Sequence, residues 1–138
     1  MDKTDARRKK ILDIVAALPD TDGTSIVENL FEPLRIELTS LISEEGFRSV
    51  FERSIFLTAR NVPWFVAGQS SPDASPLHDL RTMLAQQSRS EAREASTALL
   101  LNLSDLVASL IGEPLTIDIL RSAWGKDALG SLGEEFQA

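Results

Sequence analysis

The chain has 138 residues, of which 43% are hydrophobic and 25% charged, and this composition is typical of an ordinary globular domain. It contains no cysteine and a single histidine, which excludes disulfides, thiolate metal sites and a two-histidine zinc site. Its net charge of −7 argues against a broad phosphate-binding surface, and we expect a cytoplasmic protein that binds neither a membrane nor nucleic acid.

The first predicted helix covers residues 5–18, and its apolar residues recur at helical spacing: Ile11, Leu12, Val15 and Leu18. The turn residues of "PDTDG" end it. A second helix is predicted to begin at Ser25, because Glu28 stands at the spacing of a capping box. Pro33 predicts a kink or a new helix start.

From Pro33 an apolar stripe continues to "SEEG", where Gly46 is predicted to stop the helix in a left-handed cap. The next helix begins near Phe47, ends before Pro63 and carries an apolar face of Phe47, Val50, Phe51, Ile55 and Phe56. The segment "GQSSPDASP", residues 68–76, predicts a loop.

Residues 77–111 contain neither proline nor glycine. Strong helix formers in the middle favour one long helix over this whole range, and a break near residues 88–90 is the alternative. Gly112 and Pro114 then predict a corner, after which Thr116 caps a short helix from Ile117 to about Trp124 that packs back on the long one.

These elements predict an all-α, single-domain bundle of five or six helices. The domain is expected to cover residues 1–125, followed by a loosely ordered tail at residues 126–138, where glycines are frequent and apolar residues sparse.

The most concentrated charge is the basic run Arg7, Arg8, Lys9 and Lys10. It falls in the first turns of a helix, where cations face the positive end of the helix dipole, so a use in binding is one interpretation. The other interpretation is that the run is a solvent-exposed helix face whose charges are balanced by neighbouring acids. The run is therefore a candidate partner contact and the basis of a third hypothesis, a weak nucleic-acid binder.

Trp64 and Phe65 are the second candidate partner contact. They follow Pro63 at a helix end, and tryptophan often anchors protein interfaces. Aromatic residues at such a turn can equally close the hydrophobic core, so whether Trp64 lies in the core or on the surface stays open.

Catalytic, cofactor-binding and metal-binding residues are not predicted. An enzyme or ligand-binding bundle would have to bring together Glu44, Glu45, Arg60 and His78 around a cavity. We expect instead a non-catalytic helical module for protein–protein interaction or regulation, without a cofactor. Its partner is predicted to be another protein or a second copy of the chain.

Overall fold

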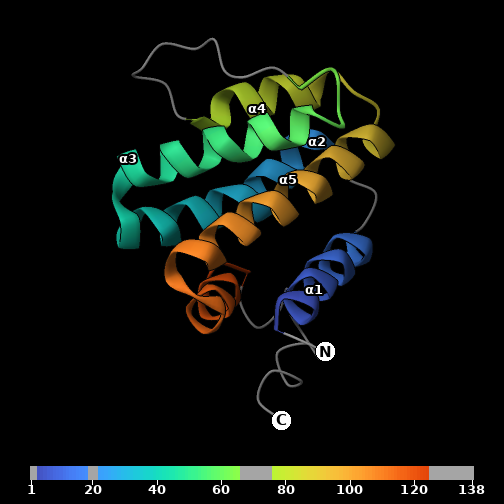
Figure 1. Ribbon diagram of the computed structural model, residues 1–138. Helices are drawn as coiled ribbons and strands as arrows, with labels where there is room; N and C mark the ends of the chain where they lie inside the picture. The colour runs from blue at the N-terminus through green and yellow to red at the C-terminus, as the bar shows by residue number, and fades with distance from the viewer. Residues whose placement is uncertain (1–2, 19–21, 66–75, 125–138) are drawn as a thin grey trace.

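The computed structural model describes residues 3–18, 22–65 and 76–124. It is an all-α bundle, as the sequence predicts, and no strand occurs within these ranges. The expected tail at residues 126–138 lies outside the described residues. Figure 1 shows α5 (Arg89–Ile111) in the middle, with α1 (Lys3–Ala17) on one side and the α3 hairpin on the other.

Helix α1 buries Ile11, Ile14 and Val15 against its neighbours. Leu12, which the periodicity places on the apolar face, is half exposed instead. The far end of α1 is closed by another element, because Arg93 of α5 donates hydrogen bonds to the carbonyls of Val15 (2.9 Å) and Leu18 (3.2 Å). A cation at a helix C-terminus satisfies the otherwise unpaired carbonyls there.

The next helical segment begins earlier than predicted. Asp22 caps α2 (Gly23–Ile26) by accepting a hydrogen bond from the Ser25 amide at 2.9 Å. The chain then continues through a π-helical turn, η1 (Val27–Phe31), into α3 (Glu32–Ala59). Pro33 therefore does not break the helix, because the wider turn before it absorbs the position without an amide hydrogen.

Helix α3 folds back on itself at Ser43, three residues before the predicted stop. Ser43 has φ 75° and ψ 167°, and its hydroxyl accepts a hydrogen bond from the Gly46 amide at 3.2 Å. Ser43 is thus the N-cap of the second half, and Gly46 is helical rather than a left-handed cap. A side chain at Gly46 would lie 3.2 Å from the Ile42 Cβ, which explains the glycine.

The prediction of one long helix over residues 77–111 is wrong. The structure has α4 (Pro76–Ala85) and α5, separated by a turn, and the Ser88 hydroxyl caps α5 by accepting from the Glu91 amide at 3.1 Å. The break lets α4 pack on α2, where a Cβ at Gly23 would lie only 2.4 Å from the Cβ of Leu84. The buried residues of α4 (Leu77, Leu80 and Leu84) and those of α5 from Leu99 to Val107 would point in different directions on one straight helix. Such a helix could not bury both sets in the same core.

The last helix covers residues 113–124 and packs back on the bundle, as predicted. It begins before the expected cap: Gly112 has φ 95°, and Thr116 donates to its carbonyl from both the amide (3.1 Å) and the hydroxyl (2.7 Å). Pro114 is accommodated in the first turn, where no amide donor is needed. The Trp124 indole donates to the Leu30 carbonyl at 2.9 Å and closes this helix onto η1.

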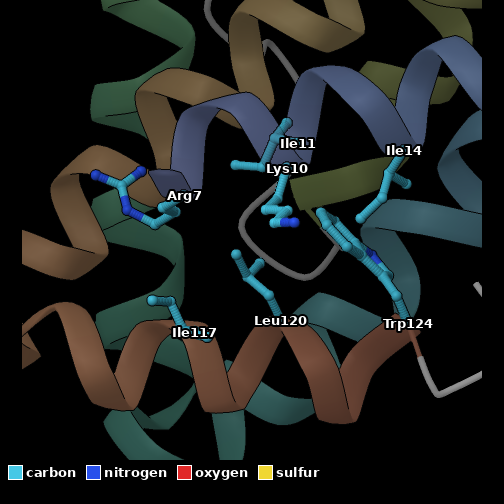
Figure 2. Close-up of a pocket in the computed structure, with 7 residues that line it drawn as sticks. All are labelled: Arg7, Lys10, Ile11, Ile14, Ile117, Leu120 and Trp124. Carbon is cyan, nitrogen blue, oxygen red and sulfur yellow. The ribbon is translucent and has the colours of Figure 1, made fainter. Parts of the chain in front are cut away.

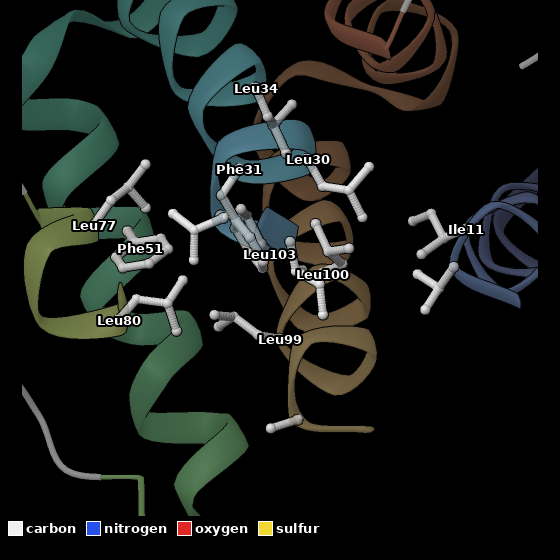
Figure 3. Packing of buried hydrophobic residues seen from close by; sticks show 14 of the residues in the cluster. Ile11, Leu30, Phe31, Leu34, Phe51, Leu77, Leu80, Leu99, Leu100 and Leu103 are labelled. Atoms are coloured by element: carbon white, nitrogen blue, oxygen red, sulfur yellow. The ribbon is translucent and has the colours of Figure 1, made fainter. Parts of the chain in front are cut away.

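The core surrounds α5. Figure 3 shows Leu99, Leu100 and Leu103 between Ile11 on one side and the Phe31 and Phe51 rings on the other. The rings of Phe31 and Phe51 meet edge to face at 6.4 Å, and Phe47 stacks on Phe51 at 5.4 Å. The Phe31–Phe51 contact holds the second half of α3 against η1, and the inward direction of Phe47 and Phe51 leaves the opposite face of that half exposed.

Candidate functional site

Arg7, the first residue of the predicted contact run, lies in the interior. Its side chain is 1% exposed and donates hydrogen bonds to the carboxylate of Glu113 (2.8 and 3.0 Å) and the hydroxyl of Ser104 (2.6 Å). It also forms an ion pair with Asp105 at 2.8 Å. Arg7 therefore joins α1 to α5 and to the last helix rather than presenting a charge to a partner.

These contacts also set the protonation of Arg7. Burial alone would lower its pKa, but the hydrogen bonds and negative charges of Glu113 and Asp105 outweigh that effect and raise the pKa. Arg7 therefore carries its positive charge at neutral pH.

The remaining residues of the run are engaged as well. Arg8 forms an ion pair with Asp105, and Lys9 pairs with Asp13 at 3.1 Å one turn along α1. Lys10 is partly buried and has a polar interaction of its own. The structure thus disperses the four charges, and no concentrated basic patch remains on α1.

The two aromatic candidates close the core. Phe65 is buried, and Trp64 is half-buried with its ring edge-on to Phe65 at 5.1 Å. The Phe65 amide donates to the carbonyl of Val62 at 3.0 Å, which fixes the turn that carries both rings. On the open question about Trp64, the side chain is half-buried and packs against the core.

The four residues considered for an enzyme do not converge. Glu44 and Glu45 begin the second half of α3, whereas Arg60 follows its end, about 22 Å away at 1.5 Å per residue. His78 is exposed on α4. Among the described residues, no group of three or more histidine, aspartate or glutamate side chains could hold a metal ion.

Two interior spaces lined by described residues are small. One of them, of about 10 Å³, lies between α1 and the last helix. Figure 2 shows Ile14 of α1 on one side of it and Leu120 and Trp124 of the last helix on the other. Another of about 10 Å³ lies between Leu38 and Val107. Each has room for one water molecule at most.

A larger groove of about 300 Å³ lies open to solvent along α1 and α5. Two of its three polar lining residues are engaged within the chain: Arg93 binds the carbonyls at the end of α1, and Thr97 donates to the Arg93 carbonyl at 2.8 Å. The third, Glu94, is exposed, so the groove offers a single carboxylate beside an apolar lining.

Three exposed leucines lie close in sequence to the corners at Ser43 and Gly112. Leu41 is seven residues after Leu34 and Leu110 seven after Leu103, so both continue rows that are buried further back, because seven residues are close to two helical turns. Yet Leu41 is 49% exposed and Leu110 64%. Figure 1 shows the corner of α3 beside the end of α5, and Leu115, 40% exposed, follows the next corner.

We call Leu41, Leu110 and Leu115 the apolar end. The sequence shows the helical spacing that puts Leu41 in the row of Leu34 and Leu110 in the row of Leu103. It does not reveal that the neighbouring helices stop covering these two rows one turn before Leu41 and Leu110. That depends on the corners at Ser43 and Gly112, which periodicity alone does not locate.

Comparisons of the chain with protein-family models, with curated proteins and with solved structures gave no match. Within the part of the chain that the structure describes, α5 is long and apolar enough to cross a membrane by length and composition alone. This is weak evidence, because the core helix of a globular protein meets the same criterion.

Proposed function

We propose that the protein is a non-catalytic helical module that acts by binding a protein, in an adaptor or regulatory role. The observation that carries the proposal is the apolar end, where two core-facing rows continue past the point at which other helices cover them. Exposed apolar surface on a folded protein commonly marks an interaction site when it forms a patch. We expect the module to act in the cytoplasm and without a cofactor.

Two features weaken the alternatives. A nucleic-acid binder would need the basic run of α1 on the surface, but Arg7 is buried and Arg8 and Lys9 are paired with acids. An enzyme built on Glu44, Glu45, Arg60 and His78 would need these side chains around one cavity, and the helices separate them.

The proposal predicts that a protein co-purifies with the chain when it is tagged and expressed at its native level, and that Leu110→Gln reduces the recovery. Loss of one buried leucine at an interface weakens binding about tenfold or more. Ile36→Gln is the matched control, because Ile36 is also exposed but lies on the side of α3 away from the Leu34 row. The captured protein is then titrated against the purified variants by calorimetry.

The proposal is supported if the wild type and Ile36→Gln bind equally and Leu110→Gln binds at least tenfold more weakly. It fails if nothing co-purifies, or if Leu110→Gln binds as well as the wild type while its circular dichroism and melting curve are unchanged.

A further inference from the structure

A second surface lies on the second half of α3. Six exposed residues share one side of this helix, within an arc of about 100° at 100° per residue. We call them the α3 stripe: Glu45, Ser49, Glu52, Arg53, Phe56 and Arg60. Phe56 is 57% exposed and is the large apolar side chain of the stripe.

The charges of the α3 stripe are ordered along the helix. Both acids, Glu45 and Glu52, lie in its first part, and both arginines, Arg53 and Arg60, lie in its second part. The Arg53 guanidinium carbon is 5.5 Å from the centre of the Phe56 ring, a cation–π contact that holds Arg53 on the stripe.

These four charges have no ion pair within the described ranges, although ion pairs are common elsewhere on the molecule. Arg7 and Arg8 bind Asp105, and Arg81 binds Glu28 and Glu32. The α3 stripe thus combines an exposed aromatic ring with acids and arginines that form no ion pair with another described residue.

We propose that the α3 stripe binds the same stripe of a second copy of the chain, as an antiparallel helix pair about a twofold axis. The axis passes between Glu52 and Arg53. Arg60 then faces Glu45 of the other copy, and Arg53 faces Glu52. A twofold axis repeats each contact, so one interface gains four ion pairs from two kinds of contact.

The same axis places the ring of Phe56 over Ser49 of the other copy. Serine is small, so a phenylalanine ring fits opposite it without displacing a larger side chain. Because the axis repeats this contact, one aromatic ring fills each half of the interface. The antiparallel arrangement also brings opposite ends of the two helix dipoles together.

The order of the charges favours a second copy over other partners. An acidic peptide would satisfy Arg53 and Arg60 but would be repelled by Glu45 and Glu52. Nucleic acid would meet the same two carboxylates with its phosphates. A surface that carries both signs in separate halves is complementary to itself when it is turned around.

One pair of helix faces is smaller than the 1,200 Å² or so of a standard stable interface, so the dimer is weak, with a dissociation constant of about 10 to 100 μM. Because its charges are exposed, salt weakens it further. This inference rests on the proposed function, since it names one protein partner and assigns it a surface other than the apolar end.

The test is sedimentation velocity of the full chain at protein concentrations from about 5 μM to about 500 μM, a range that brackets the expected affinity. The wild type is expected to shift from monomer to dimer. Glu45→Arg and Arg60→Glu are each expected to stay monomeric, because each places two like-charged pairs in the interface. Glu94→Arg is the control, since it makes the same charge change on an exposed residue of α5.

Mixing the two monomeric variants is the decisive step. When one chain of each variant pairs, the arginine introduced at position 45 faces the glutamate introduced at position 60 of the other chain. The second contact joins the native Arg60 of the first chain to the native Glu45 of the other, so both pairs are opposite in charge. The mixture is therefore expected to dimerise as the wild type does. Phe56→Ser, at an exposed position, is expected to weaken the wild-type dimer about tenfold.

A monomeric wild type at all concentrations overturns the inference, and so does a mixture that stays monomeric. A wild-type dimer that Glu45→Arg, Arg60→Glu and Phe56→Ser leave unchanged overturns it as well. In each of these cases the proposed function would still hold if another protein co-purifies with the chain and Leu110→Gln reduces its recovery.

Discussion

Ser43 has a backbone conformation that is unusual for any residue with a side chain. Its φ of 75° and ψ of 167° lie in a region occupied almost only by glycine. The serine is nevertheless suited to the corner in one respect, because its hydroxyl caps the following helix through the Gly46 amide. Steric strain and capping therefore act in opposite directions at this residue.

Ser43→Gly is expected to raise the free energy of unfolding by about 1 kcal/mol, because relief of about 1–3 kcal/mol of strain exceeds the loss of the cap and the greater flexibility of glycine. Ser43→Ala keeps the strain and loses the cap, so it is expected to lower that free energy by about 1 kcal/mol. Urea unfolding measures both. The control is Ser49→Gly, in a regular turn of the same helix, which is expected to lower the free energy of unfolding. If Ser43→Gly lowers that free energy by a similar amount, the backbone at the corner is not strained.

From the sequence, a turn within "SEEG" could be predicted but its residue could not. Gly46 is the obvious candidate by conformational preference, but the corner falls at Ser43 and brings Ile42 close to position 46, where a Cβ would lie 3.2 Å from the Ile42 Cβ. Such a choice depends on packing between residues on the two sides of the corner, which local preferences do not contain.

At the scale of helices, α1 is held by polar contacts at both ends as well as by its apolar face. Arg7 binds Glu113 near its beginning, and Arg93 binds the Val15 and Leu18 carbonyls at its end. The sequence predicts the apolar face but assigns Arg7 to the surface. Charge runs usually are solvated, and the acids that draw Arg7 inward lie near the other end of the chain.

Arg7→Ala is expected to lower the free energy of unfolding by about 2–3 kcal/mol, because it removes the buried cation to which Glu113 and Ser104 bind and leaves Asp105 with Arg8 alone of its two arginine partners. Lys9→Ala removes an exposed pair one turn away and is expected to cost less than about 0.5 kcal/mol. Urea unfolding of the two variants measures the difference. Equal stabilities would show that Arg7 contributes no more than a surface charge.

The break between α4 and α5 shows why helix length was the least predictable property of an element. Alanine, glutamate and arginine between residues 85 and 98 favour helix, so local preference gave no reason to stop. Ser88 provides a cap, but the break is selected by the packing of α4 on α2. The alanines have their own role, because Ala92 and Ala95 are buried where helices approach closely.

Across the whole molecule, exposed and half-buried charges connect elements that the core alone would leave free to slide. Arg81 of α4 reaches Glu28 at 2.9 Å and Glu32 at 2.7 Å, and Arg35 binds Glu32 at 3.0 Å. Burial would raise the pKa of Glu32, but the hydrogen bonds from Arg81 and Arg35 outweigh it and lower the pKa.

A lowered pKa means that the unfolded chain binds a proton at Glu32 at a higher pH than the folded chain does. The stabilisation is therefore complete above the ordinary value of 4.5 and is lost as the pH falls through the lower folded value. At about pH 7, Glu32→Gln is expected to be less stable than the wild type by about 1–2 kcal/mol, and the gap should close below about pH 4.

Urea unfolding of both proteins across this pH range measures the gap, with Glu37→Gln as the control on the same helix. The control is expected to differ from the wild type by less than about 0.5 kcal/mol at each pH. A gap for Glu32→Gln that does not change with pH would contradict the role assigned to these ion pairs.

The fold class could be predicted because helical periodicity runs through nearly the whole chain. The two proposed surfaces could not, because each depends on which helix face the corners leave uncovered. The apolar end is exposed because the corners at Ser43 and Gly112 end the neighbouring helices early. The α3 stripe is exposed because the α3 hairpin directs Phe47 and Phe51, on the opposite face, into the core.

The link between Arg7 and Glu113 has a consequence for the order of events during synthesis. The two residues are 106 positions apart, so α1 leaves the ribosome long before its partners are translated. Until then Ile11 and Ile14 have no surface to cover them. Docking of α1 is therefore expected to be among the last steps of folding, after residues 113–124 emerge, and a chaperone that meets the nascent chain would find its first helix still unburied.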